Sequence, residues 1–172
     1  MKLPAMRAQR SVQYIFIGLM LSTPLINSVQ ADANAPIEIS ADSKKTDFKA
    51  GLATYQGAVD IQQGSLHATG DQADLELEQG ELVRAILTGN PATFEKTDEQ
   101  GERIRGHADR AEYAPATQIL TLTGKAELER AGDTLRAPII TYNLETEQAE
   151  AGDPDSGERV TTTIAPRSEP TE

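Results

Sequence analysis

The sequence predicts an all-β fold in which consecutive antiparallel strands form a roll or jelly-roll. Three observations predict it. Apolar or small residues alternate with polar ones through most of the chain, turn residues separate the alternating runs, and the same strand–turn–strand unit returns along the sequence. After residue 31, no stretch carries a convincing helical pattern of apolar residues at i, i+3, i+4 and i+7.

The first unit spans Tyr55 to Leu75. Every second residue is apolar or small on both sides of a turn at Gln63-Gly64-Ser65. These residues are Tyr55, Gly57, Val59 and Ile61 before the turn, and Leu66, Ala68 and Gly70 after it. A period of two means that one face of each strand is buried and the other contacts water. The unit is therefore predicted to be a β-hairpin.

The unit returns at 87–113 and again at 122–142. Leu87-Thr88-Gly89 and Leu122-Thr123-Gly124 correspond to Tyr55-Gln56-Gly57, and further turns are expected at 98–101, 115–117 and 131–133. With the flanking segments, the chain should form about ten strands or more. Small residues are expected where the roll bends or where its interior stays open: Gly57, Ala68, Gly70, Gly106, Ala108 and Gly124.

Shorter strands are predicted at both ends of the roll. Ile37 and Ile39 begin one, residues 45–48 form a second, and Val160, Thr162 and Ile164 form the last, which has high β-propensity. We therefore expect a β-jelly-roll domain at 37–166, a flexible leader at 32–36 and a disordered tail at 167–172.

The first 31 residues are predicted to be a cleavable signal peptide. Lys2, Arg7 and Arg10 form a basic start, residues 12–29 are largely apolar and uncharged, and Val29-Gln30-Ala31 suits signal peptidase. The alternative is a membrane anchor. Polar residues and a proline interrupt the apolar run at 22–27, and no basic stop-transfer cluster follows it, which favours cleavage and export.

Charge and composition exclude several classes of protein. The formal charge is −11, and it becomes −14 without residues 1–31, which contain three basic and no acidic side chains. Such a surface repels phosphate backbones, so it argues against nucleic-acid binding. The absence of cysteine excludes disulfides, thiolate metal sites and a lipidated lipoprotein. Aromatic residues are few, which fits either a thin sandwich or an interior filled by another molecule.

The sequence predicts no enzyme. His67 and His107 belong to no metal or nucleophile motif, so surface positions are expected for both. Asp42, Asp71, Asp74 and Asp109 return with the repeat, which indicates a structural role rather than catalysis. The segment 153–157 resembles part of a calcium loop but lacks its distal glutamate, which favours a turn. No catalytic residue, no metal site and no cofactor is predicted.

Several short segments, in order, resemble the LptA (OstA-like) family of periplasmic lipopolysaccharide transport proteins. The likeness covers about 35–167. It is carried by Pro36-Ile37-x-Ile39-x-Ala41-Asp42, Tyr55-x-Gly57-x-Val59, Gln63-Gly64-Ser65-Leu66, Gly89-Asn90-Pro91-Ala92-Thr93-Phe94, Gly106-His107-Ala108, Leu122-Thr123-Gly124-Lys125-Ala126, Ile140-Thr141-Tyr142 and Arg159-Val160-Thr161-Thr162.

The resemblance implies a periplasmic bridge in a Gram-negative cell. The family's fold is a slightly twisted, open β-jelly-roll whose interior holds the acyl chains of lipopolysaccharide. Its subunits stack end to end, and its partners are a bitopic inner-membrane component and an outer-membrane translocon. Positions that face lipid in the family fall on Ile37, Phe94 and Tyr113.

Alternation alone adds six candidates for lipid contact: Val59, Ile61, Leu66, Leu122, Leu128 and Tyr142. The alternative for all nine residues is ordinary core packing. Edge strands at Ile37 and Ile39 and at Val160, Thr162 and Ile164 would offer unpaired backbone groups for head-to-tail self-association. A second function stays open, which is a β-scaffold or adaptor that joins inner- and outer-membrane complexes without holding lipid.

Overall fold

The structure is a computed structural model that describes residues 35–98, 100–155 and 157–166. The predicted signal peptide at 1–31, most of the predicted leader at 32–36 and the predicted tail at 167–172 lie outside these ranges. The described residues form ten strands and no helix: β1 (Glu38–Ser40), β2 (Ser43–Asp47), β3 (Leu52–Gln63), β4 (Leu66–Glu78), β5 (Glu81–Thr97), β6 (Arg103–Ala114), β7 (Ile119–Arg130), β8 (Asp133–Asn143), β9 (Gln148–Ala151) and β10 (Thr161–Thr163). No helix long and apolar enough to cross a membrane occurs in this part of the chain.

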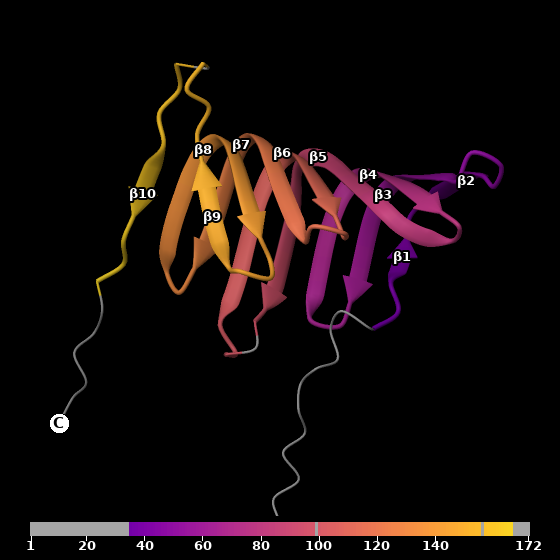
Figure 1. Ribbon diagram of the computed structural model, residues 1–172, viewed down its shortest axis with the longest axis horizontal. Helices are drawn as coiled ribbons and strands as arrows, with labels where there is room; N and C mark the ends of the chain where they lie inside the picture. Colours follow the sequence, from indigo (N-terminus) through magenta and orange to yellow (C-terminus); the bar gives the residue numbers. More distant parts are fainter. Residues whose placement is uncertain (1–34, 99, 156, 167–172) are drawn as a thin grey trace, which may run out of the picture.

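The long strands follow one another as antiparallel hairpins. The order along the sheet is β1-β3-β4-β5-β6-β7-β8-β10, with β2 also paired to β3 and β9 also paired to β8. The predicted all-β fold of consecutive antiparallel strands is therefore confirmed. Figure 1 shows β1 and β2 at one end of the roll and β9 and β10 at the other, so the sheet is open at both ends.

Each long strand bends near its middle and contributes to two layers. The register between β3 and β4 shifts between Gln56 and Val59, and four later strand pairs have comparable shifts at mid-strand. A β-bulge of this kind bends the strand and increases its twist. Several strands accordingly arch over at the upper side of the roll (Figure 1).

The short strands distinguish the two layers. β1 pairs with the second half of β3, and β10 with the first half of β8. β2 pairs with the first half of β3, and β9 with the second half of β8. We call these the β1–β10 layer and the β2–β9 layer. The layers are continuous at the bends, and the hairpin turns of both layers lie at the opposite, open side.

Glycine makes two of the bends possible. Gly57 and Gly124 have φ of +80° and +81°, and the residues after them, Ala58 and Lys125, also have positive φ. Only glycine adopts this left-handed backbone without a steric cost. Asp42 packs against Gly57, and a Cβ atom on Gly124 would lie 2.6 Å from Oδ2 of Asp109. Two of the four recurring aspartates, Asp42 and Asp109, thus lie against the bends.

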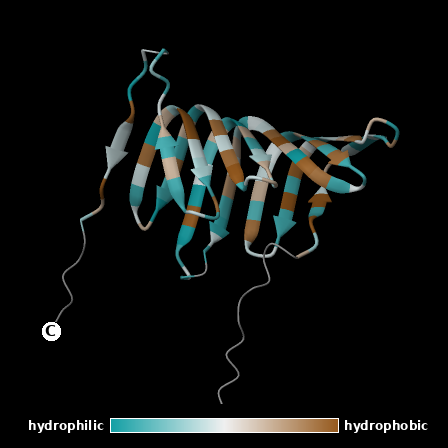
Figure 2. Cartoon of the chain, in the orientation of Figure 1, coloured by the Kyte–Doolittle hydropathy of each residue, from teal (hydrophilic) through white to brown (hydrophobic). Residues whose placement is uncertain are grey.

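The core is packed along the bends. Two clusters of buried side chains follow them, one around Val59 and Leu87 and the other around Leu122 and Ile140. Many of their members are alanines, so the layers approach closely here. Figure 2 shows hydrophobic and hydrophilic residues alternating along the strands, as the period of two predicted. The closed core therefore lies at the bend side, and the layers diverge toward their hairpin turns.

The bend can be tested with two glycine substitutions. Gly80 has φ of +89° and open space around it, so Gly80→Ala measures backbone strain alone. We expect it to lower the free energy of unfolding by about 1 kcal/mol. Gly124→Ala adds a clash with Asp109 and should cost about 2–4 kcal/mol, measured by urea denaturation. Equal losses for the two variants would show that the contact at the bend does not matter.

Candidate functional site

A cavity of about 720 Å³ lies between the two layers. Phe94 and Ile104 form part of its wall in the β1–β10 layer, and Leu75 and Leu120 form part of its wall in the β2–β9 layer. Well-packed protein interiors contain few voids larger than a water molecule, so a space of this size is no packing defect. It falls within the range of ligand pockets, roughly 300–1,000 Å³.

The wall is apolar and the rim is polar. Aliphatic and aromatic side chains form the interior, whereas the five polar lining residues lie in or next to hairpin turns: Gln63, Lys96, Asp98, Gln118 and Glu147. Small residues keep the interior open. A Cβ atom on Gly106, for example, would lie 2.6 Å from Cε1 of Phe94, so the glycine makes room for the phenyl ring. The cavity therefore suits a molecule with a long apolar part and a polar end.

Three tyrosines line this wall, Tyr55, Tyr113 and Tyr142, and burial acts on the last two. Burial raises the pKa of Tyr113. Burial also raises the pKa of Tyr142, where the nearby Arg130 charge opposes the effect and Glu147 and Asp98 add to it. Both phenols therefore stay neutral well above neutral pH, and neither adds a charge to the cavity.

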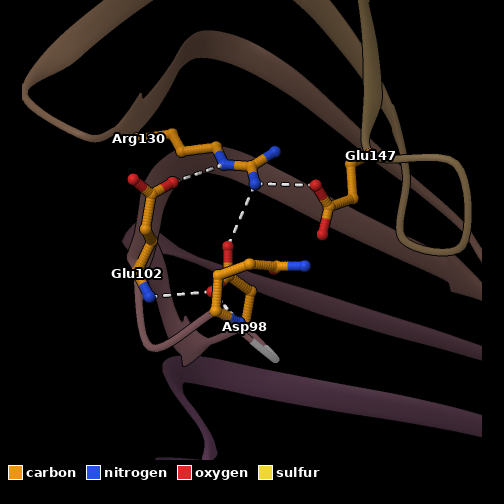
Figure 3. A network of polar contacts seen from close by, with 5 residues as sticks. Asp98, Glu102, Arg130 and Glu147 are labelled. Carbon is orange, nitrogen blue, oxygen red and sulfur yellow. Dashed lines mark hydrogen bonds and ion pairs between the residues drawn. The ribbon is translucent and has the colours of Figure 1, made fainter.

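An ion-pair network joins the two layers across one part of the open side. Nη2 of Arg130, at the end of β7, donates to Asp98 Oδ2 at 3.0 Å and to Glu147 Oε2 at 2.7 Å. Its Nε donates to Glu102 Oε2 at 3.3 Å. Figure 3 shows Arg130 between Glu147 on one side and Asp98 and Glu102 on the other. We call these four residues the Arg130 clasp.

The clasp links elements that are far apart in the chain. Three of its members lie in the β1–β10 layer: Arg130 is the last residue of β7, and Asp98 and Glu102 lie in the turn between β5 and β6. Glu147 lies in the turn between β8 and β9, in the other layer. The Asp98 side chain is only 6% exposed, and its Oδ1 accepts the N–H groups of Gln100 and Glu102. The hydrogen bond to Glu147 raises the pKa of Arg130. The layers are thus held together near Asp98, Gln118 and Glu147, at one part of the cavity rim.

A family model described as "LptA/(LptD N-terminal domain) LPS transport protein" matches residues 38–148. The chain belongs to this family. Among curated relatives, the lipopolysaccharide export system protein LptA of Escherichia coli K12 is 30% identical over 158 residues, which cover 87% of this chain and 85% of that one. LptA of Haemophilus influenzae is 28% identical over 160 residues, covering 91% and 92% of the two chains.

A solved structure from this family has the same fold. The crystal structure of LptH from Pseudomonas aeruginosa, the LptA homologous periplasmic component of the conserved lipopolysaccharide transport device, superposes with a TM-score of 0.73. The match covers 79% of this chain and 99% of that chain at 24% sequence identity. The resemblance to the LptA (OstA-like) family predicted from the sequence is therefore confirmed, and so is the β-jelly-roll.

Six of the nine residues predicted to contact lipid line the cavity. They are Ile37, Ile61, Leu66, Phe94, Tyr113 and Tyr142. The structure places Val59, Leu122 and Leu128 elsewhere, in the closed core, where they are 1%, 0% and 6% exposed. These three side chains point to the buried face of their strands but are packed in the core clusters and are not among the lining residues. Alternation predicts which face of a strand is buried and not whether a side chain on that face borders the cavity.

Other wall residues were missed. Leu75 and Leu77 continue an alternating run and Leu120 lies two positions before Leu122, so the same period could have identified them. No sequence pattern indicates the Arg130 clasp, because its three side-chain pairs join residues 17, 28 and 32 positions apart.

The side chains considered for catalysis lie away from the wall. Neither histidine is among the lining residues, and His67 Nε2 lies 2.7 Å from Asp60 Oδ2 at the exposed surface. Asp42 and Asp109 contact the bend glycines. In the described ranges, no cluster of three His, Asp or Glu side chains could hold a metal ion.

The clasp should stabilise the fold more than an ion pair within one layer does. Arg130→Met leaves the buried Asp98 carboxylate without its cation and should lower the free energy of unfolding by about 1–3 kcal/mol. The control is Arg105→Met, which breaks an exposed pair with Glu129 and should cost about 0.5 kcal/mol or less. Urea denaturation measures both. Equal costs would mean that the clasp does not hold the layers together.

Proposed function

We propose that the protein is a periplasmic lipopolysaccharide-binding bridge that carries lipopolysaccharide from the inner to the outer membrane. The observation that carries the proposal is the apolar cavity with a polar rim between two layers that are continuous at the bends. In this proposal the acyl chains of the lipid occupy the cavity, and its polar part stays at the open side. The predicted signal peptide at 1–31 would deliver the protein to the periplasm.

The physical chemistry of the cavity supports this ligand. Burial of acyl chains releases water from apolar surface, and each buried methylene contributes about 0.8 kcal/mol. Such binding needs no strongly basic pocket, so it is compatible with the formal charge of −14 that remains without residues 1–31. The interior offers no cluster of polar groups that would hold a sugar or a nucleotide, because its polar residues lie at the rim.

Relatives support the substrate and the compartment. LptA of Escherichia coli and of Haemophilus influenzae are both named lipopolysaccharide export system proteins. LptH is named a periplasmic component of a lipopolysaccharide transport device. By this likeness, the partners of the chain would be an inner-membrane component and an outer-membrane translocon of such a system.

We also propose that copies stack head to tail through their edge strands. Among the strands of the described residues, none lies on the outer side of β1 and β2 at one end of the roll or of β9 and β10 at the other (Figure 1). The predicted edge residues Ile37 and Ile39 lie beside or within β1, Thr162 lies within β10, and Val160 and Ile164 flank β10. Ile164 is 75% exposed. Because the two ends differ, such pairing is open-ended and joins the cavities of successive copies.

Photo-crosslinking tests whether the cavity holds lipid. A photoreactive amino acid at Phe94, in the cavity wall, should give lipopolysaccharide adducts in Gram-negative cells that depend on the protein. The matched control is Glu95, the next residue on the strand, which is exposed and faces the opposite way. It should give none. A functional protein without adducts at Phe94 would favour the scaffold or adaptor, which joins the membrane complexes without holding lipid.

A truncation tests the stacking. Ending the chain after Arg159 removes β10, so large oligomers should give way to smaller ones in light scattering. Ending it after Pro166 keeps β10 and serves as the control. Oligomers of unchanged size after the shorter truncation would contradict a role for β10 in stacking.

A further inference from the structure

Lys96 is the only cation among the described residues that line the cavity. It lies on β5 two positions after Phe94, so its side chain is on the same face of the strand and points toward the cavity. In the register with β6 it pairs with Ile104, another wall residue. Lys96 is partly buried, as a lysine is when its apolar stem lies along a wall and its ammonium group stays in water.

The acidic side chains at this rim already have hydrogen-bond partners. Asp98 and Glu147 both accept hydrogen bonds from Arg130, and the second oxygen of Asp98 accepts two backbone N–H groups. Across the described ranges, no ion pair joins Lys96 to a carboxylate, whereas most arginines there have one, as Arg84, Arg105 and Arg136 do. In an acidic protein, a cation without an acidic partner at the mouth of an apolar cavity is a natural site for an anion.

We propose that the Lys96 ammonium group binds a phosphate group on the head of the lipid whose acyl chains fill the cavity. The proposal rests on the proposed function and adds the orientation of the lipid. The phosphate group of the lipid then lies near the hairpin turns of the β1–β10 layer, and its acyl chains run inward past Phe94 toward Leu87. An ammonium group binds phosphate as a point charge through charge-assisted hydrogen bonds.

The alternative is that Lys96 contributes only its apolar stem to the wall. Two substitutions separate the charge from the stem. Lys96→Met keeps an unbranched apolar side chain and removes the charge, and Lys96→Arg keeps the charge. Lys45→Met is the control, because Lys45 is an exposed cation on β2 that is not among the lining residues.

The test compares two fluorescent lipids with identical acyl chains, a phosphatidic acid and a diacylglycerol, by fluorescence anisotropy with the full mature chain. We expect the wild type to bind the phosphatidic acid about five to ten times more tightly at low salt, with the preference shrinking as salt rises. Lys96→Met should lose this preference and keep its affinity for the diacylglycerol. Lys96→Arg and Lys45→Met should behave as the wild type does.

Other outcomes would overturn the proposal in distinguishable ways. If Lys96→Met keeps the preference for phosphatidic acid, the role of Lys96 is wrong and the lipid carrier stands. If neither lipid binds the wild type, the carrier function fails and the role of Lys96 fails with it. If millimolar inorganic phosphate leaves the wild type's preference for the phosphatidic acid unchanged, the preference does not come from a phosphate site and the proposal is wrong.

Discussion

The bend in the middle of each long strand is the constraint on which the rest of the structure depends. It folds one continuous sheet over on itself, so that the long strands contribute to both of the layers between which the cavity lies. Two of the bends require left-handed backbone at Gly57 and Gly124, and the carboxylates of Asp42 and Asp109 pack against those glycines. If the strands were straight, the sheet would be flat and would enclose nothing.

The bend also divides the apolar residues into two groups with different roles. Residues beside it, such as Val59 and Leu122, pack against each other and close the core. Residues nearer the hairpin turns, such as Leu75 and Tyr113, face a space that the side chains do not fill. Packing at the bends stabilises the fold, so the cavity can stay open without loss of the structure. The same alternating pattern therefore serves both stability and binding.

Much of the fold could be predicted from the sequence, because strand period and turn chemistry are local. The turns at Gly64 and Gly132 and the antiparallel order follow from residues close together in the chain. The bends at Gly57, Gly70 and Gly124 were expected from small residues alone. How deeply each side chain is buried could not be predicted in this way, since it depends on how far the two layers diverge. The Arg130 clasp was not predictable either, because its members meet only after the layers form.

The central claim is that acyl chains occupy the space between the layers, and methyl NMR tests it most directly. With isotope-labelled protein and unlabelled lipopolysaccharide, intermolecular NOEs should connect acyl protons to the methyl groups of Ile61, Leu75 and Leu120 in the cavity wall. The core methyl groups of Val59 and Leu122 should show none or only weak ones. NOEs confined to exposed methyl groups, such as those of Val160 and Ile164, would contradict the account.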